Sequence, residues 1–182
     1  NNPRSALDAY RVVAEDEDVN PELRAQALYG QSVALQDLGR RDEAEALLQR
    51  LIDANRGGPL LASARLGLGR LYATDGRTAQ AEDLLRRVAE NSDSETGAEA
   101  LVRLGMLLQE QGQPREAIRE LDRVSSLFPG YPEWVARSLL EQAAAYRQLG
   151  ETGEATRIYD QVMSEYGGTP FAEEARTEKQ AL

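Results

Sequence analysis

The side chains that could do chemistry in this chain are carboxylates, guanidinium groups and hydroxyls, because its 182 residues include no histidine and no cysteine. Metal sites built on thiolate or imidazole are therefore excluded, as are Cys–His and Ser–His nucleophilic catalysis. Hydrolysis by paired carboxylates needs two of them facing one bond, whereas the adjacent Glu173 and Glu174 point apart on a helix. The sequence also holds no glycine-rich phosphate-binding loop. We therefore predict a protein that is not an enzyme and that uses no cofactor and no metal.

The remaining chemistry is recognition, and the charge of the chain restricts the class of partner. It has 31 acidic and 21 basic residues and a formal net charge of −10. Nucleic acids and anionic lipids both attract basic surfaces, so neither is an expected partner. No apolar run reaches the roughly 18 residues that a membrane-spanning helix needs, so we expect no membrane insertion. The expected partner is a protein or a peptide.

The elements that must position recognition residues are repeated helix pairs. Each copy is marked by an alanine, which we call the anchor, and the anchors recur every 36 to 38 residues: Ala6, Ala44, Ala81, Ala117 and Ala155. Five residues before the last four anchors stands Gly39, Gly76, Gly112 or Gly150. Four residues after the five anchors stands Tyr10, Leu48, Leu85, Leu121 or Tyr159. Twelve residues before the last four stands a small residue, Ser32, Gly69, Gly105 or Ala143. This spacing predicts two helices per copy, joined by a tight turn and packed closely at the small residues.

These landmarks resemble the tetratricopeptide repeat (TPR), a helix–turn–helix unit of about 34 residues. The resemblance implies an all-α, right-handed superhelical solenoid of antiparallel helix pairs, with about ten helices here. The longer intervals and the segments FPGYP (residues 128–132) and YGGTP (residues 166–170) resemble a bacterial envelope subgroup. That subgroup includes outer-membrane assembly lipoproteins and periplasmic proteins associated with the Tol–Pal system. The bacterial periplasm or cell envelope is therefore the favoured location, with the cytoplasm as the alternative.

The chain is predicted to form one solenoid over residues 1–182, as part of a longer protein. Its predicted parts are a half repeat (1–19), four repeats (20–56, 57–93, 94–130 and 131–168) and a second half repeat (169–182). Asn2 and Asn20 are expected to cap helices, and Ser92 with Glu95 fits a capping box for a helix that ends near Gln111.

An unpaired helix at each end is expected to expose an apolar face. The residues are Tyr10 and Val13 at one end and Phe171 and Ala175 at the other. Exposed apolar patches promote association, so we expect end-to-end self-association.

The family resemblance implies that partners bind a concave face lined by the first helix of each repeat. The candidate partner-binding residues on it are Tyr29, Val33, Leu66, Arg70, Val102, Arg103, Met106, Leu140 and Arg147. One row is apolar in all four repeats: Tyr29, Leu66, Val102 and Leu140. This row either forms a groove for an extended or helical segment or packs between successive first helices. The arginines Arg70, Arg103, Arg137 and Arg147 either attract a partner's carboxylates or are neutralised by Glu99, Glu110 and Glu141.

Trp134 is the only tryptophan, and it lies in a loop with Phe128 and Tyr131. The cluster is either a hot spot for a partner or a staple that fixes the loop to the following helix. Taken with the repeats, the sequence predicts a non-catalytic protein–protein interaction scaffold. The alternative is a structural spacer or self-association module within a larger repeat protein.

Overall fold

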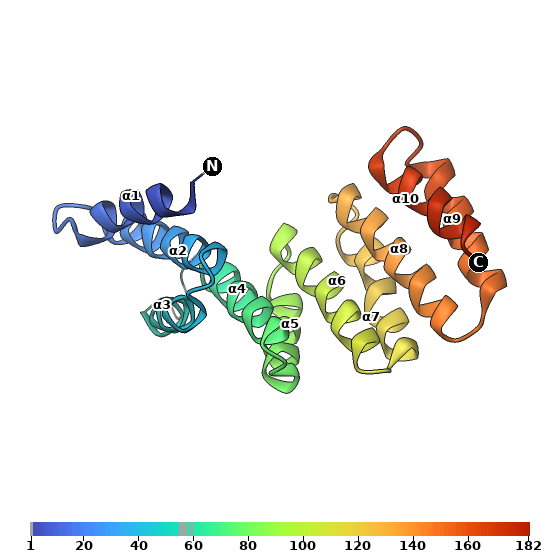
Figure 1. Cartoon of the computed structure of the whole chain (residues 1–182), viewed down its shortest axis with the longest axis horizontal. Helices are drawn as coiled ribbons and strands as arrows, with labels where there is room; N and C mark the ends of the chain where they lie inside the picture. The colour runs from blue at the N-terminus through green and yellow to red at the C-terminus, as the bar shows by residue number, and fades with distance from the viewer. Residues whose placement is uncertain (1, 55–57, 59) are drawn as a thin grey trace. The chain divides into compact units, whose positions relative to one another are not determined.

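The computed structural model describes residues 2–54, 58 and 60–182, which contain ten α-helices and no strand (Figure 1). The chain divides into two compact units, unit 1 (Asn1–Leu84) and unit 2 (Leu85–Leu182). Unit 1 contains α1 (Pro3–Glu15), α2 (Pro21–Asp37), α3 (Arg41–Ala54), α4 (Leu61–Thr74) and the start of α5 (Thr78–Asn91). Unit 2 contains the rest of α5 and α6 (Glu95–Glu110), α7 (Pro114–Leu127), α8 (Pro132–Gln148), α9 (Thr152–Glu165) and α10 (Pro170–Gln180). The predicted all-α fold is confirmed, whereas the division into repeats remains a prediction.

Each unit is a stack in which successive helices pack together. In unit 1, α2 contacts α1, α3 and α4, and in unit 2, α8 contacts α6, α7, α9 and α10. We call α2, α4, α6, α8 and α10 first helices, and α1, α3, α5, α7 and α9 second helices. Thus α2 and α8 each touch a neighbouring first helix as well as the second helices on either side.

The turn within each repeat has the same geometry four times. Gly39, Gly76, Gly112 and Gly150 have φ angles of 72°, 73°, 74° and 74°, in the left-handed region that favours glycine. The following residue donates its N–H to a carbonyl five positions earlier, from Arg40 to Leu35 at 2.8 Å and from Gln113 to Leu108 at 2.9 Å. This bond satisfies a carbonyl at the end of the first helix, as in a Schellman motif. The glycine spacing in the sequence is therefore a helix-termination signal.

The predicted caps hold for two helices and fail for a third. The Asn2 side chain accepts from the Arg4 N–H at 3.0 Å, and that of Asn20 from the Leu23 N–H at 2.8 Å. The predicted Ser92–Glu95 capping box is wrong, because α6 begins at Glu95 itself and its N-cap is Ser94. The predicted boundary between the repeats 20–56 and 57–93 lies outside the described residues.

The repeat positions read from the sequence are the core positions of the fold. Four of the anchors are completely buried: Ala44, Ala81, Ala117 and Ala155. The large side chains four positions later are at most 1% exposed: Leu48, Leu85, Leu121 and Tyr159. Burying one such large side chain contributes about 1.5–3 kcal/mol. The first copy differs, because Ala6 and Val13 are half-buried and Tyr10 is 41% exposed.

The expected apolar surface at α10 is absent, and that prediction is wrong. Ala175 is fully buried, and Phe171 packs against the core formed by α8 and α9. The guanidinium group of Arg137 also lies over the Phe171 ring, 5.4 Å from its centroid. The exposed helical residues of α10 after its first proline are Glu173, Arg176, Thr177 and Gln180. Since these are polar or charged, the end-to-end contact expected from the sequence lacks its apolar surface on α10.

Candidate functional site

Three members of the apolar row belong to the core. Leu66, Val102 and Leu140 are buried, and Leu140 lies in one cluster with Tyr159. Tyr29 is half-buried, and its ring lies 3.7 Å from the position that a Cβ on Gly67 would take in α4. The structure thus favours the second interpretation of this row, in which the side chains pack between helices. A partner could reach the three buried residues only if the helices separated.

A different column of the first helices faces solvent. Val33, Arg70 and Met106 are exposed, and Ala144 is half-buried. We call these four residues, each eleven positions before an anchor, the outer column. Met106 is 37% exposed, which is high for a large apolar side chain in the middle of a helix. Among the predicted site residues, Val33 in unit 1 and Met106 in unit 2 are therefore apolar side chains that a partner can reach.

The arginines of unit 2 are paired with carboxylates. Arg103 binds Glu99 at 2.5 Å on α6, as the second of the two interpretations requires. Arg137 binds Glu174 at 2.7 Å and lies 3.9 Å from Glu141. Arg147 binds Glu178 at 2.5 Å. Glu174 and Glu178 lie on α10, so the arginines of α8 tie two first helices together.

Glutamines and a half-buried carboxylate link α6 to α8 beside these ion pairs. The Gln109 amide donates to Glu141 at 3.5 Å, and the Gln148 amide donates to Gln109 at 3.5 Å. Burial raises the pKa of Glu141, and the nearby charge of Arg137 only partly opposes that shift. These groups can hold helices in register and form hydrogen bonds, but they include no nucleophile with an adjacent base.

Unit 1 contains a polar cluster that the sequence reasoning missed. Both carboxylate oxygens of Glu45 accept from Arg77, at 2.9 and 2.8 Å, and one accepts from the Tyr72 hydroxyl at 2.9 Å. The Arg77 guanidinium also lies 3.7 Å from the centroid of the Tyr72 ring. The hydrogen bond from Arg77 lowers the pKa of Glu45, although burial acts in the opposite direction.

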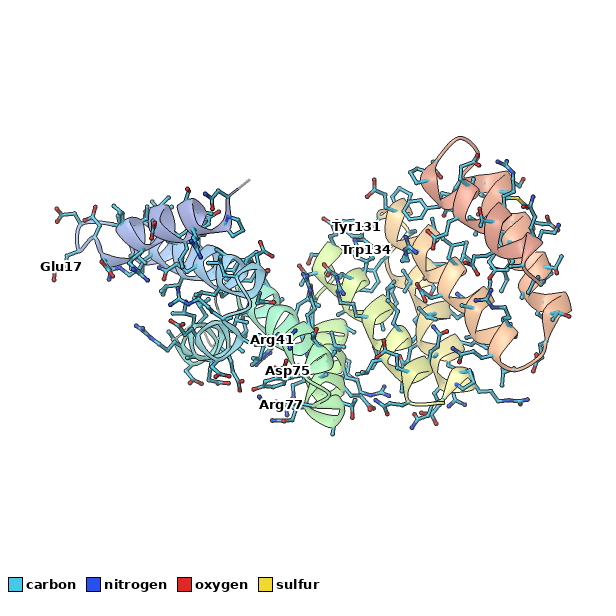
Figure 2. All side chains as sticks on the ribbon, in the orientation of Figure 1. Glu17, Arg41, Asp75, Arg77, Tyr131 and Trp134 are labelled. Atoms are coloured by element: carbon cyan, nitrogen blue, oxygen red, sulfur yellow. The ribbon has the colours of Figure 1, made fainter. Side chains whose placement is uncertain are left out.

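This cluster joins α3 to the turn that follows α4. A second ion pair, Arg41 to Asp75 at 2.8 Å, spans the same two elements, and Figure 2 labels Arg41, Asp75 and Arg77 there. One residue in the sequence could have indicated this cluster. Tyr72 stands at a repeat position that holds leucine in the copies before and after it, at Leu35 and Leu108. Its hydroxyl required a polar partner when the ring was buried.

The aromatic loop before α8 is fixed to α6. Phe128 is buried against Gly97, where an added Cβ would lie 2.8 Å from the ring. The Trp134 indole donates to the Glu95 carboxylate at 3.1 Å, and Figure 2 labels Trp134 and Tyr131 at this end of α6. The cluster does act as a staple, but the prediction that it fixes the loop to the following helix is wrong. It joins the loop and the start of α8 to α6, the preceding first helix.

An open groove of about 550 Å³ lies between α1 and α2 in unit 1. One face of α1 lines it with Pro3, Ala6, Tyr10 and Val13. From α2 it is lined by Leu23, Gln26, Ala27, Tyr29, Gly30, Val33, Ala34 and Asp37, and Asn2 completes it. Two predicted site residues, Tyr29 and Val33, therefore meet the predicted apolar end of α1. The sequence predicted the exposure of Tyr10 but not that a groove forms beside it.

Within residues 2–54, 58 and 60–182, no three His, Cys, Asp or Glu side chains are grouped so that they could hold a metal ion. In that part of the chain, no helix is both long enough and apolar enough to cross a membrane.

Solved structures with the same fold cover nearly the whole chain. A putative kinesin light chain with TPR-like repeats from Podosopora anserina is 20% identical, with a TM-score of 0.71 over 89% of this chain and 85% of that one. MamA is 21% identical, with a TM-score of 0.65 over 99% and 92%. YrrB, described as a TPR protein with an unusual peptide-binding site, is 21% identical, with a TM-score of 0.65 over 96% and 84%. At these identities the likeness shows the fold alone.

Sequence comparison gives the family. Nothing among the curated proteins matches the chain. Two family profiles described as tetratricopeptide repeat do match, one over residues 1–59 and 29–96 and the other over residues 98–164. They indicate no enzymatic family, and together they span most of the 182 residues. The chain therefore belongs to the tetratricopeptide repeat family.

Proposed function

We propose that the chain is a non-catalytic protein-interaction scaffold that binds a partner segment along its first helices. The observation that supports this most is the outer column, which leaves the apolar side chains of Val33 and Met106 exposed. Accessible apolar groups surrounded by polar ones are typical of interaction sites. YrrB, a structural neighbour, is described as having a peptide-binding site, which agrees with a peptide partner.

The partner segment is expected to be apolar on one side and acidic at its edges. In unit 2 it would contact Met106, beside Arg103 and Arg147. Both arginines already bind carboxylates of this chain, so an acidic partner would exchange one pairing for another and gain orientation more than affinity. A segment bound to unit 1 would instead contact Tyr29, Val33 and Arg70.

The test compares two exposed residues of unit 2. Met106→Glu charges the outer column, whereas Leu127→Glu places the same charge on a second helix at a site that is 52% exposed. Both variants should fold, since exposed substitutions change stability by about 0.5 kcal/mol or less. Partners captured by quantitative cross-linking in the source organism should be lost with Met106→Glu and retained with Leu127→Glu. If the two variants capture the same partners, recognition does not use this surface.

A structural spacer or self-association module is the second candidate. It is favoured by the apolar groove between α1 and α2, since unpaired apolar repeat faces associate. Sedimentation analysis over the micromolar to millimolar range distinguishes the two functions. A spacer that stacks on copies of itself should show an association that grows with concentration and is abolished by Tyr10→Glu.

We further propose a bacterial envelope assembly as the setting of this scaffold. What supports it is the resemblance of two inter-repeat segments, residues 128–132 and 166–170, to those of periplasmic TPR proteins. Fractionation of the source cells with an antibody against the chain tests the proposal. Recovery with the cytoplasmic fraction would overturn it.

A further inference from the structure

An open pocket of about 310 Å³ lies in unit 1, between α1 and the turn that joins α2 to α3. We call it the arginine pocket, and its lining residues are Arg4, Leu7, Asp8 and Arg11 from α1 and Leu38 and Arg40 from the turn. These residues carry three positive charges and one negative charge, although the whole chain has a net charge of −10. The pocket is therefore a positively charged site on an acidic chain.

The arginines of the pocket are only partly neutralised by carboxylates of the chain. Arg40 binds Glu43 at 2.6 Å in an exposed ion pair. In the described part of unit 1, neither Arg4 nor Arg11 has an ion pair. The hydrogen bond from Arg40 lowers the pKa of Glu43, and the charge of Arg11 acts in the same direction. Arg11 and Arg40 therefore lie close to the same space, where a further carboxylate would meet both of them.

A later copy shows which carboxylate is missing beside Arg40. By distance from the anchor alanines, Arg77 stands at the position of Arg40. Arg77 binds Glu45, which lies on the preceding second helix, at 2.8 Å. The residue of α1 at the position of Glu45 is Leu7. Arg40 thus has the place of Arg77 without its interhelical partner, and it turns to Glu43 on its own helix instead.

The same comparison applies to Arg11. Its counterpart in α5 is Arg86, which binds Glu120 on the next second helix at 2.6 Å. The residue of α3 at the position of Glu120 is Leu47. At the junction of α1 and α3 the two arginines are thus retained, while both glutamates that bind such arginines elsewhere in the chain are leucines. A carboxylate from another polypeptide can take their place.

The pocket stays accessible whether or not further repeats precede α1. In unit 2, α7 meets the preceding second helix at Glu120, whereas its Arg115 binds Glu151 at the start of the following second helix at 3.5 Å. Arg4 stands at the position of Arg115, on the side that faces the following helix. A preceding repeat would instead cover other residues of α1, by analogy with α7 and α9: Ala6, Ala9, Tyr10 and Val13. None of these four lines the arginine pocket.

We propose that the arginine pocket binds an acidic segment of a partner protein, through two carboxylates about 10 Å apart that flank an uncharged residue. Arg4 and Arg11 are seven residues apart, which is about 10 Å along a helix. Asp8 lies between them and repels a third carboxylate there, whereas the half-buried Leu38 offers an apolar contact. In an extended segment of the polyproline II type, residues three positions apart lie on one side at about 9 Å. Two glutamates with that spacing can therefore reach both arginines.

The probe is the blocked hexapeptide SEALES, in which two glutamates stand three positions apart with a leucine between them. It is titrated into the ¹⁵N-labelled chain, and the Nε–H signals of the arginine side chains are followed. Those of Arg4, Arg11 and Arg40 should shift and saturate with a Kd on the order of 1 mM, because exposed ion pairs are individually weak. The uncharged peptide SQALQS should bind roughly tenfold more weakly, since it lacks both ion pairs.

Variants of the chain test the position of the peptide. Arg11→Gln should weaken SEALES binding by about two- to fivefold, the effect of one exposed ion pair. Arg50→Gln is the matched control, because Arg50 is exposed on α3 and does not line the pocket. Circular dichroism checks that both variants keep their helix content.

A carboxylate added to the chain itself gives a stricter test. Leu47→Glu places a glutamate where Glu120 stands relative to Arg86, so it should bind Arg11 and weaken SEALES binding about as much as Arg11→Gln does. Leu47→Gln has a similar shape without the charge and should bind SEALES as the parent chain does. Leu47 packs against the core of unit 1, so urea unfolding is used to confirm that both variants are folded under the conditions of the titration.

The proposal is wrong if SEALES gives no saturable shift at about 10 mM, or if Arg11→Gln and Arg50→Gln bind it equally. Inorganic phosphate is titrated for comparison, and tighter binding of phosphate than of SEALES at Arg11 would make the pocket a phosphate site instead. A dimer of the chain alone that Arg11→Gln dissociates would make a second copy the occupant. The pocket belongs to α1 and the α2–α3 turn rather than to the surface around Met106, so failure here is distinct from failure of the proposed scaffold function.

Discussion

Gly105 and Gly30 offer a test of how the helices pack, because an added methyl group meets a close neighbour at both positions and only one neighbour can move. A Cβ on Gly105 would collide with the Leu121 side chain, at 2.6 Å from Cδ2 and 2.9 Å from Cδ1, and closer still to the branching carbon Cγ. A Cβ on Gly30 would lie 2.6 Å from Cζ of Tyr10. Ordinary carbon contacts are about 3.5–4.0 Å.

The two neighbours differ in freedom. Leu121 is fully buried, so its branching carbon cannot retreat without moving α7. The Tyr10 ring is 41% exposed at an open groove and can rotate away. Replacing a helical glycine by alanine gains about 1 kcal/mol in helix propensity. Overpacking a core costs about 1–3 kcal/mol. Gly105→Ala should therefore lower the free energy of unfolding by up to about 2 kcal/mol, and Gly30→Ala should leave it unchanged or raise it by up to about 1 kcal/mol.

Urea unfolding followed by circular dichroism measures both variants against the parent chain. The slope of the transition must stay the same for the comparison to report stability alone. The expected order is Gly30→Ala at or above the parent and Gly105→Ala below it. If Gly105→Ala proves as stable as Gly30→Ala, then α6 and α7 do not approach closely at this crossing, and the small-residue column has another explanation.

Three further predictions concern polar groups. Arg77 lowers the pKa of Glu45, so this pair stabilises the fold above about pH 4.5, and that stabilisation is lost as the pH falls further. In acid unfolding, the free energy of unfolding should therefore fall less steeply with decreasing pH for Glu45→Gln than for the parent chain. Burial raises the pKa of Glu141, which means that its ionised form destabilises the fold at neutral pH; Glu141→Gln should therefore raise the melting temperature at pH 7, and the gain should shrink toward acid pH. Trp134→Phe removes the hydrogen bond to Glu95 and should lower the free energy of unfolding by about 0.5–1.5 kcal/mol, measured by urea unfolding.

The sequence predicted the fold well because the repeated positions carry strong local constraints. A left-handed glycine ends each first helix except α10, as at Gly39 and Gly112. A buried alanine recurs in each second helix after the first copy, as at Ala44 and Ala117. Both constraints are properties of a single turn or crossing, so residue type and spacing reveal them. The capping box at Ser92 failed because its pattern also fits residues that precede the helix.

The accessible surface was harder to predict, because accessibility depends on neighbours that residue type alone does not specify. Val102 and Met106 lie one helical turn apart on α6, and both are apolar in the sequence. Val102 faces the packed interior of unit 2 and Met106 faces solvent. Likewise Arg137 and Arg147 suggested a positive face, but their partners Glu174 and Glu178 lie on α10, more than 30 residues away.

The same dependence explains the exposed tyrosine in the α1–α2 groove. The alanine, tyrosine and valine that line α1 are buried when they recur in α9, so their exposure in α1 is not a property of those residues. In a repeat protein every internal copy provides the covering helix for the next one, and stability is the sum of such nearest-neighbour interfaces. The exposure of a side chain in one copy is therefore set by the helices that lie beside it, and the residue types of that copy do not specify it.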